Sequence, residues 1–276
     1  MKRKAAMRLR VVFLLSWFLA ASSLSRGHSP DPTQARLAVV AHLAAMTQRD
    51  FTALSSEAEA GDREAQFWLG SIYEQGRLVP KNPEQAEIWF LKSAEKGYAP
   101  AECTVGLMYW YLDSEAAKAA MWLQRAAQKG DSEAQFWLGA AYEQGSLGTI
   151  NYREALNWLE KSAKQGHPEA QASLGQMYED GEGVKQNYAM AAKWYRKAAE
   201  HVPNFGGAGQ GRNNLGLLYL QGLGVPKDYV QAYFWFTLAN GEPSFSASHA
   251  KAHMTQAEIA KAERMANDWK TRHSQQ

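Results

Sequence analysis

A short motif that recurs along the chain constrains its fold more than any other feature. A glycine, usually preceded by leucine, recurs at spacings of 36, 33, 36 and 41 residues, followed three residues later by tyrosine and further on by tryptophan. The glycine, tyrosine and tryptophan of each copy are Gly70, Tyr73 and Trp89; Gly106, Tyr109 and Trp122; Gly139, Tyr142 and Trp158; Gly175, Tyr178 and Trp194; and Gly216, Tyr219 and Trp235. A period of about 20 to 50 residues is typical of a solenoid, in which each repeat packs on the next.

Each copy predicts a pair of helices. Ala65, Leu69 and Tyr73 recur every four residues, which places them on one helical face. In four copies a glycine suited to a left-handed helix end is followed six residues later by a residue suited to a helix start. These pairs are Gly76 and Asn82, Gly145 and Asn151, Gly181 and Asn187, and Gly222 and Asp228. The fold class is therefore all-α: an α-solenoid of about five helix-turn-helix repeats with capping helices at its N- and C-terminal ends.

The recurring glycine indicates close approach between helices. In an isolated helix Gly70 would cost about 1 kcal/mol relative to alanine, so its repetition needs a packing reason. We expect the repeated tryptophan to fill the space between units, while the alanine three residues before it lets the helices close.

The first residues have the composition of an export signal. A basic start is followed by the apolar run Val11–Ala21 and then by small residues. A run of 11 residues is short for a membrane span, which needs about 20. We expect cleavage near Ser25, with an uncleaved anchor as the alternative. No cysteine follows the run, so the expected product is not a lipoprotein but a periplasmic or secreted protein without stable membrane insertion.

The landmarks divide the chain into a series of repeats between two ends. We expect a signal peptide (1–25), N-terminal capping helices or a half repeat (26–61), repeats at 62–97, 98–130, 131–166, 167–201 and 202–241, and C-terminal capping helices (242–276). Thr255 and Glu258 predict a capping box at the start of the last helix. The second repeat is short and has Leu112 in place of its capping glycine. The fifth has an insertion containing Gly207, Gly209 and Gly211, which favours a flexible loop.

The combined pattern resembles a known family. The chain repeats the pattern A-x-x-G-x-x-x-A-Q-x-x-L-G-x-x-Y-x-x-G, then an Asp or Asn cap and A-x-x-W-x-x-K-A-A, and this pattern resembles the Sel1-like repeat. The resemblance is fullest in GHPEAQASLGQMYEDGEGVKQNYAMAAKWYRKAAE. The resemblance implies a right-handed, tetratricopeptide-like solenoid used in protein–protein interaction. It also implies, for an exported bacterial member, a non-enzymatic adaptor in the cell envelope, or a regulator or assembly factor of an envelope machine. We expect a monomer that binds a protein or peptide.

Charge and cysteine content disfavour other classes of function. Five of the 30 basic residues lie in the first ten positions, so residues 26–276 carry a net charge of −3, which disfavours nucleic acid as a partner. Cys103 is the single cysteine; it allows no internal disulfide and no thiolate zinc site, and it is expected to be a small apolar side chain. A hydrolase acting on cell-wall or β-lactam compounds is the alternative from another class. However, the family members that suggest it are cysteine-rich.

No cofactor, metal or catalytic residue is expected. His249 and His253 are four residues apart and could face one side of a helix, but the sequence offers no third ligand. The candidate partner-binding residues instead flank the repeat landmarks, where aromatic side chains anchor bound chains and carboxylates select basic groups. These are Phe67, Trp68, Glu74, Leu107, Trp110, Tyr111, Phe136, Trp137, Glu143 and Glu179. The alternative is that the aromatic members pack between neighbouring helices.

Overall fold

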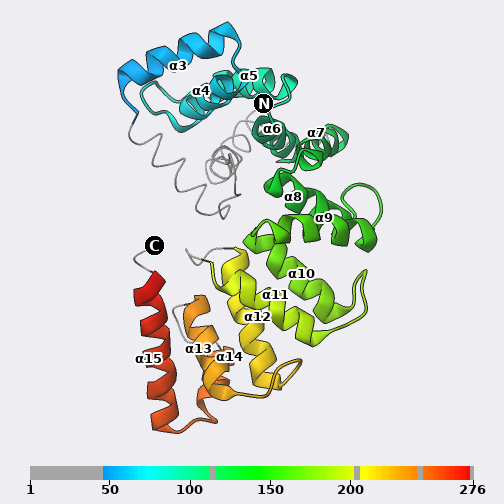
Figure 1. The fold of residues 1–276 in the computed structure, drawn as a ribbon, viewed down its shortest axis with the longest axis vertical. Helices are drawn as coiled ribbons and strands as arrows, with labels where there is room; N and C mark the ends of the chain where they lie inside the picture. Colours follow the sequence, from blue (N-terminus) through cyan, green and yellow to red (C-terminus); the bar gives the residue numbers. More distant parts are fainter. Residues whose placement is uncertain (1–45, 112–115, 202–205, 241–244, 274–276) are drawn as a thin grey trace, which may run out of the picture. The chain divides into compact units, whose positions relative to one another are not determined.

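The described part of the chain is helical. The computed structural model describes residues 46–111, 116–201, 206–240 and 245–273, and within these ranges it contains helices and no strands (Figure 1). The helices are α3 (Gln48–Ala60), α4 (Arg63–Gln75), α5 (Pro83–Glu95), α6 (Ala99–Tyr111), α7 (Ala116–Gln128), α8 (Ser132–Glu143), α9 (Tyr152–Lys164), α10 (Pro168–Asp180), α11 (Tyr188–Ala199), α12 (Gly207–Gln221), α13 (Tyr229–Asn240), α14 (Phe245–Lys251) and α15 (Gln256–His273).

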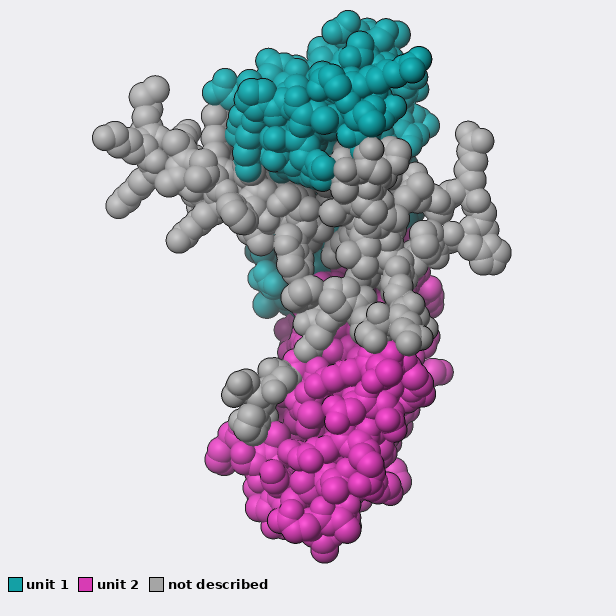
Figure 2. Space-filling model, turned by 90° about the vertical axis from the view of Figure 1, so that its left-hand side faces the viewer, with its two compact units in different colours: residues 1–151 teal, residues 152–276 magenta. Residues whose placement is uncertain are grey.

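The chain divides into two compact units, one formed by residues 1–151 and the other by residues 152–276 (Figure 2). In the first, α4 pairs with α5 and α6 with α7, while α3 covers α4 and α8 packs on α7. In the second, α10 pairs with α11 and α12 with α13, while α9 packs on α10 and α15 on α13. Each helix thus contacts mainly its neighbours along the chain, and the predicted all-α repeat solenoid is confirmed.

The recurring glycine brings the two helices of a repeat into contact. A Cβ atom at Gly70 would lie 2.8 Å from the ring of Phe90, and one at Gly175 would lie 2.5 Å from the ring of Tyr195. Gly106 and Gly216 meet Leu123 and Phe236 in the same way. In all four pairs the partner directly follows the repeat tryptophan. The predicted close approach is confirmed, and the side chain that uses it is the neighbour of the tryptophan.

The tryptophans lie at the edge of this contact. Trp122, Trp194 and Trp235 are buried as predicted. Trp89 and Trp158 are partly exposed, so the prediction that they fill the interior is wrong for these two. In four repeats a basic side chain three residues later lies over the indole. These pairs are Lys92 over Trp89 at 4.0 Å, Arg125 over Trp122 at 4.5 Å, Lys161 over Trp158 at 4.0 Å and Lys197 over Trp194 at 4.5 Å.

The predicted helix ends are largely confirmed. Asn82 and Asn187 accept a backbone N–H at the start of α5 and α11, and Asp228 does so at the start of α13. Gly76, Gly181 and Gly222 adopt the left-handed conformation at helix C-termini. In the third repeat Gln144 caps α8 instead, and Gly145 follows it with a φ of 71°. Thr255 and Glu258 form the expected capping box.

The three glycines of the insertion lie in a helix and not in a loop, which corrects the prediction from sequence. Helix α12 begins at Gly207 and includes Gly209 and Gly211. A Cβ atom at Gly207 would overlap the backbone of Pro168, and one at Gly211 would lie 2.7 Å from the Cβ of Ala198. These glycines therefore allow α12 to pack closely on α10 and α11.

Several predictions concern residues outside the described ranges. They are the signal peptide, the first part of the expected N-terminal capping segment (26–61), and the chain around Leu112 in the short second repeat. In the expected C-terminal capping segment, α15 has a buried face formed by Ile259, Ala262, Ala266 and Trp269.

The close contact between glycine and its partner can be tested at Gly175. We expect Gly175→Ala to lower the free energy of unfolding by about 1–3 kcal/mol, because the added methyl group meets the Tyr195 ring. The better helix propensity of alanine would otherwise stabilise the protein by about 1 kcal/mol. Urea unfolding measures the difference, with Lys193→Ala on the exposed face of α11 as the control. A stabilised G175A variant would contradict the packing argument.

Candidate partner-binding site

Three of the candidate residues form one group in the first unit, and a fourth, Trp110, directly precedes one of them in the chain. Trp110 and Tyr111 end α6, and Phe136 and Trp137 lie on α8. The rings of Tyr111 and Trp137 meet edge-on with centroids 6.2 Å apart, and those of Phe136 and Trp137 are 5.4 Å apart. All four side chains are partly exposed. We call Trp110, Tyr111, Phe136 and Trp137 the aromatic cluster.

A buried carboxylate holds the indole of Trp137 in place. The indole Nε1 of Trp137 donates to Glu133 Oε1 at 2.8 Å, and Glu133 is almost fully buried. Burial, reinforced by the nearby charge of Glu133, raises the pKa of Tyr111. Tyr111 therefore keeps its proton and can donate a hydrogen bond. Fixed rings with a polar edge lose little entropy on binding, which makes such a group a suitable anchor for another chain.

Three candidates are buried and do not form a binding surface, which corrects their assignment. Phe67 is 0%, Leu107 1% and Glu74 2% exposed. The Phe67 ring packs against Trp68, Phe90 and Tyr98, with centroids 5.4 to 5.7 Å apart. The alternative stated from sequence, packing between helices, is therefore the correct one for Phe67.

Glu74 differs from an ordinary surface carboxylate. Desolvation raises its pKa to about 8, with a smaller opposing effect from Lys81. Its Oε2 atom has no hydrogen-bond partner among the described residues. At neutral pH the group is therefore mainly protonated, so it does not select a basic side chain of a partner.

The three remaining candidates are Trp68, Glu143 and Glu179. Trp68 is partly buried and packs with Ile72, together with residues of α3. Glu143 is the half-buried last residue of α8. Glu179 belongs to the second unit, where it accepts a hydrogen bond from the Tyr195 hydroxyl at 2.7 Å.

A buried polar residue that the sequence analysis did not select recurs four positions before each repeat glycine. We call this place the inner position; its residues are Gln66, Glu102, Gln135, Gln171 and Arg212. Each glutamine donates from Nε2 to the carbonyl of an alanine eight residues earlier, at 3.0 to 3.1 Å. In the sequence, the Ala-Gln pair of the repeat pattern was the signal for this buried position. The hydrogen bond of the glutamine joins the start of one helix pair to the end of the preceding helix.

Repeats two and five have charged residues at the inner position. Glu102 is fully buried and pairs with Arg125 and Lys129, each at 2.8 Å. Arg212 donates to the carbonyls of Ala199 and Leu238 at 2.8 and 3.2 Å. Its guanidinium also lies over the Trp269 ring at 4.6 Å, so it links α11, α13 and α15. Burial lowers the pKa of Arg212 to about 10, and the group stays charged at neutral pH.

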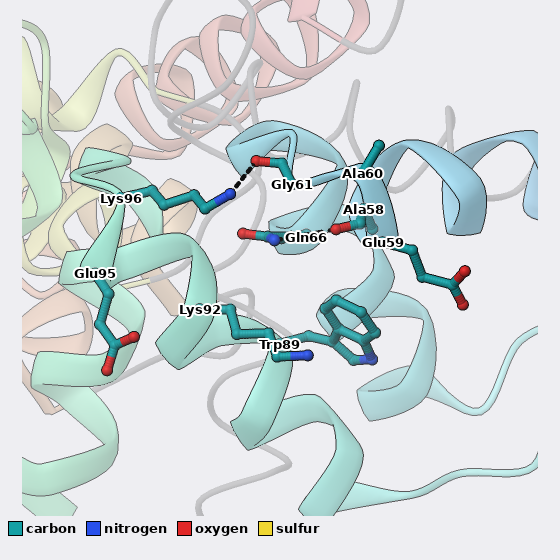
Figure 3. A pocket seen from close by; sticks show the side chains of 9 residues that line it. All are labelled: Ala58, Glu59, Ala60, Gly61, Gln66, Trp89, Lys92, Glu95 and Lys96. Atoms are coloured by element: carbon teal, nitrogen blue, oxygen red, sulfur yellow. Dashed lines mark hydrogen bonds between the residues drawn. The ribbon is translucent and has the colours of Figure 1, made fainter.

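A pocket of about 510 Å³ opens beside the inner position of the first repeat, between the C-terminal ends of α3 and α5. It is lined by Ala58, Glu59, Ala60, Gly61, Gln66, Trp89, Lys92, Glu95 and Lys96 (Figure 3). Lys96 donates to the carbonyl of Gly61, and Gln66 donates to that of Ala58.

The described residues offer little else for chemistry. Within the described ranges no three His, Cys, Asp or Glu side chains gather as a metal site would require. His253 stacks on Tyr229 with centroids 4.8 Å apart and lies 4.9 Å from His249. Cys103 is buried, as expected for a small apolar side chain. In the same part of the chain, none of the helices combines the length and apolar character that a bilayer crossing demands.

Comparison with known proteins gives a consistent result. The family model of the Sel1 repeat matches residues 63–98, 99–131, 132–167, 168–201 and 210–240, together more than half of the chain. A Sel1 repeat protein from Oxalobacter formigenes is 30% identical and superposes with a TM-score of 0.65, covering 74% of this chain and 81% of that one.

Two further relatives are more distant or only partly covered. A protective antigen of uropathogenic Escherichia coli with an SLR fold is 27% identical, with a TM-score of 0.50, over 79% of this chain and 55% of that chain. Chitin synthase regulatory factor 3 of Schizosaccharomyces pombe is 35% identical over 111 residues. That match covers 37% of this chain and only 12% of the yeast protein's length.

The raised pKa of Glu74 predicts a stability that depends on pH. The folded protein holds this proton up to about pH 8, whereas the unfolded chain releases it near 4.5. Stability should therefore fall as pH rises between these two values and then level off. We expect Glu74→Gln to raise the melting temperature at pH 8.5 relative to wild type by at least about 2 °C more than at pH 5. Half-buried Glu87→Gln is the control, and an equal effect at both pH values would contradict the assignment.

The contacts of Arg212 predict that lysine cannot replace it. A single ammonium group cannot reach the same set of carbonyls, so Arg212→Lys should lower the free energy of unfolding by about 2–4 kcal/mol. The measurement is denaturant unfolding, and Arg264→Lys on the exposed face of α15 should change stability by less than about 0.5 kcal/mol. Equal stability of R212K and wild type would show that these hydrogen bonds do not hold the C-terminal helices.

Proposed function

Because the chain belongs to the Sel1 repeat family, we propose that it is a non-enzymatic scaffold or adaptor that binds a peptide or protein segment on its surface. Sel1 repeat proteins generally mediate protein–protein interaction and are typically non-catalytic. The observation that carries the proposal is the aromatic cluster, a partly exposed set of rings on two helices of neighbouring repeats, in which Trp137 meets both Tyr111 and Phe136.

The chemistry of the aromatic cluster suits a protein segment. Trp and Tyr bury large apolar areas and still offer a polar edge, and for this reason they are enriched among the residues that dominate binding energy. The hydroxyl of Tyr111 keeps its proton, so a backbone carbonyl of the partner is a suitable acceptor. The net charge of −3 over residues 26–276 argues against a nucleic-acid partner.

A regulatory or assembly role in the cell envelope is the finer form of the proposal. The basic and apolar start of the chain has the pattern of a signal peptide, which supports a periplasmic or secreted location without a lipid anchor. The yeast relative is named as a regulatory factor of an enzyme. By analogy, this chain would act as a monomeric adaptor that brings the components of an envelope complex together.

Crosslinking in cells tests the scaffold function. We expect crosslinking followed by purification to capture a defined protein, and Trp110→Ala combined with Tyr111→Ala to weaken its binding by about tenfold or more. Met121→Ala is the matched control, because Met121 is an exposed apolar residue outside the aromatic cluster. Capture of the same protein at equal affinity by the double variant would exclude the aromatic cluster as the binding surface.

A further inference from the structure

The pocket of the first repeat lies at a set of positions that recurs in other repeats, and we call this set the corner. The corner consists of the inner position, the repeat tryptophan and the residues three and seven positions after it. In repeat one these are Gln66, Trp89, Lys92 and Lys96; in repeat two Glu102, Trp122, Arg125 and Lys129; in repeat four Gln171, Trp194, Lys197 and His201. In each of these repeats the corner lies within a single unit.

In repeat two the corner is a complete carboxylate site. Arg125 and Lys129 each approach Glu102 at 2.8 Å, and Glu102 is fully buried. The same two cations keep their other contacts, because Arg125 still lies over Trp122 and Lys129 still donates to the Gly97 carbonyl at 2.8 Å. This geometry allows two basic side chains to hold a carboxylate without giving up their structural roles.

In repeat four the corner is closed by a contact between His201 and Gln171. His201 Nε2 lies 3.0 Å from Gln171 Oε1, while Gln171 Nε2 donates to the Ala163 carbonyl. The inner glutamine of that repeat therefore has partners for both ends of its amide.

Repeat one keeps both cations but lacks the carboxylate. Lys92 lies over Trp89, and Lys96 donates to the Gly61 carbonyl, as their counterparts do in repeat two. Gln66 is only 4% exposed, and its Oε1 has no hydrogen-bond partner among the described residues. A buried polar atom without a partner is uncommon in folded proteins. In Figure 3 this oxygen points toward the side of the pocket where Lys96 lies.

We propose that this pocket binds one carboxylate group of a protein partner, with Lys92 and Lys96 as its ligands. The proposal rests on the proposed function, since the carboxylate belongs to a bound peptide segment. The partner's carboxylate takes the role that Glu102 has in repeat two, and an adjacent N–H of the same segment donates to Gln66 Oε1. Lys92 gives up only an exposed contact with the indole to reach it.

The other charges of the pocket limit the ligand to a single negative charge. Glu59 and Glu95 also line it, so its four charged side chains sum to zero. In Figure 3 their carboxylates lie on opposite sides of the pocket and point away from the space between Lys96 and Gln66. They leave room for one carboxylate but repel a multiply charged anion such as phosphate. The exposed part of the Trp89 ring offers an apolar wall for the rest of the segment.

The test follows the indole N–H signal of Trp89 by NMR in the full chain, assigned with Trp89→Phe. The probes are an N-acetylated hexapeptide, Gly-Ser-Gly-Ser-Ala-Leu, with a free C-terminal carboxylate, its C-terminal amide, and the amide with one internal glutamate. We expect a saturable shift with a carboxylate-bearing peptide and none with the neutral amide. A shift with the free acid alone identifies a chain end as the ligand, and a shift with the glutamate peptide identifies an acidic side chain.

Two variants separate the pocket from a general charge effect. Gln66→Glu should supply an internal carboxylate, as Glu102 does, and abolish the peptide shift while the protein stays folded. Lys92→Gln combined with Lys96→Gln should weaken peptide binding by about tenfold or more. Equal shifts with the neutral amide, or an unchanged response in Q66E, would overturn the proposal.

The crosslinking experiment distinguishes this proposal from the scaffold function. If the K92Q/K96Q variant captures the same protein at equal affinity, the scaffold function stands and the pocket is not its binding site. If the peptides shift the Trp89 signal but no protein is captured in cells, the carboxylate site stands and the scaffold function fails.

Discussion

The structure depends on one steric constraint, the contact between a glycine in the first helix of a repeat and the side chain that follows the tryptophan in the second. Phe90, Leu123, Tyr195 and Phe236 fill this place, and a Cβ atom on the facing glycine would collide with each of them. Because the contact lies inside one helix pair, each of these four repeats forms its own small core. Contacts between consecutive pairs then extend that core along each unit.

This local organisation leaves the inner position free to vary. Its glutamines bind a backbone carbonyl of the preceding helix, Glu102 forms two ion pairs, and Arg212 joins three helices at the C-terminal end. The inner position lies in a helix in every repeat, while the charge of this buried side chain changes from neutral to negative to positive. A repeat can therefore acquire a different polar site without a change of fold.

The sequence was sufficient for the fold but not for the exposure of individual side chains. Landmark spacing predicted the helix pairs, and capping residues such as Asn82 and Asn187 predicted their ends. Phe67 and Phe136 occupy the same repeat position, yet the first is buried and the second partly exposed, because Tyr98 and Phe90 cover Phe67. Gly207 and Gly211 suggested a loop because glycine is typical of loops, and only contacts with α10 and α11 reveal their packing role. Exposure depends on neighbouring repeats, which a single repeat pattern does not contain.

Two sites in the first unit suit a partner, one through apolar contact and the other through charge. The aromatic cluster offers rings, one of which is held by Glu133, and gains affinity from buried apolar area, with little dependence on salt. The pocket beside Gln66 offers two ammonium groups, so its contribution falls as ionic strength rises. Apolar contact supplies affinity, whereas a single carboxylate site selects which segment, and in which orientation, binds. A scaffold that used both would hold its partner through aromatic contacts and identify it by one negative charge.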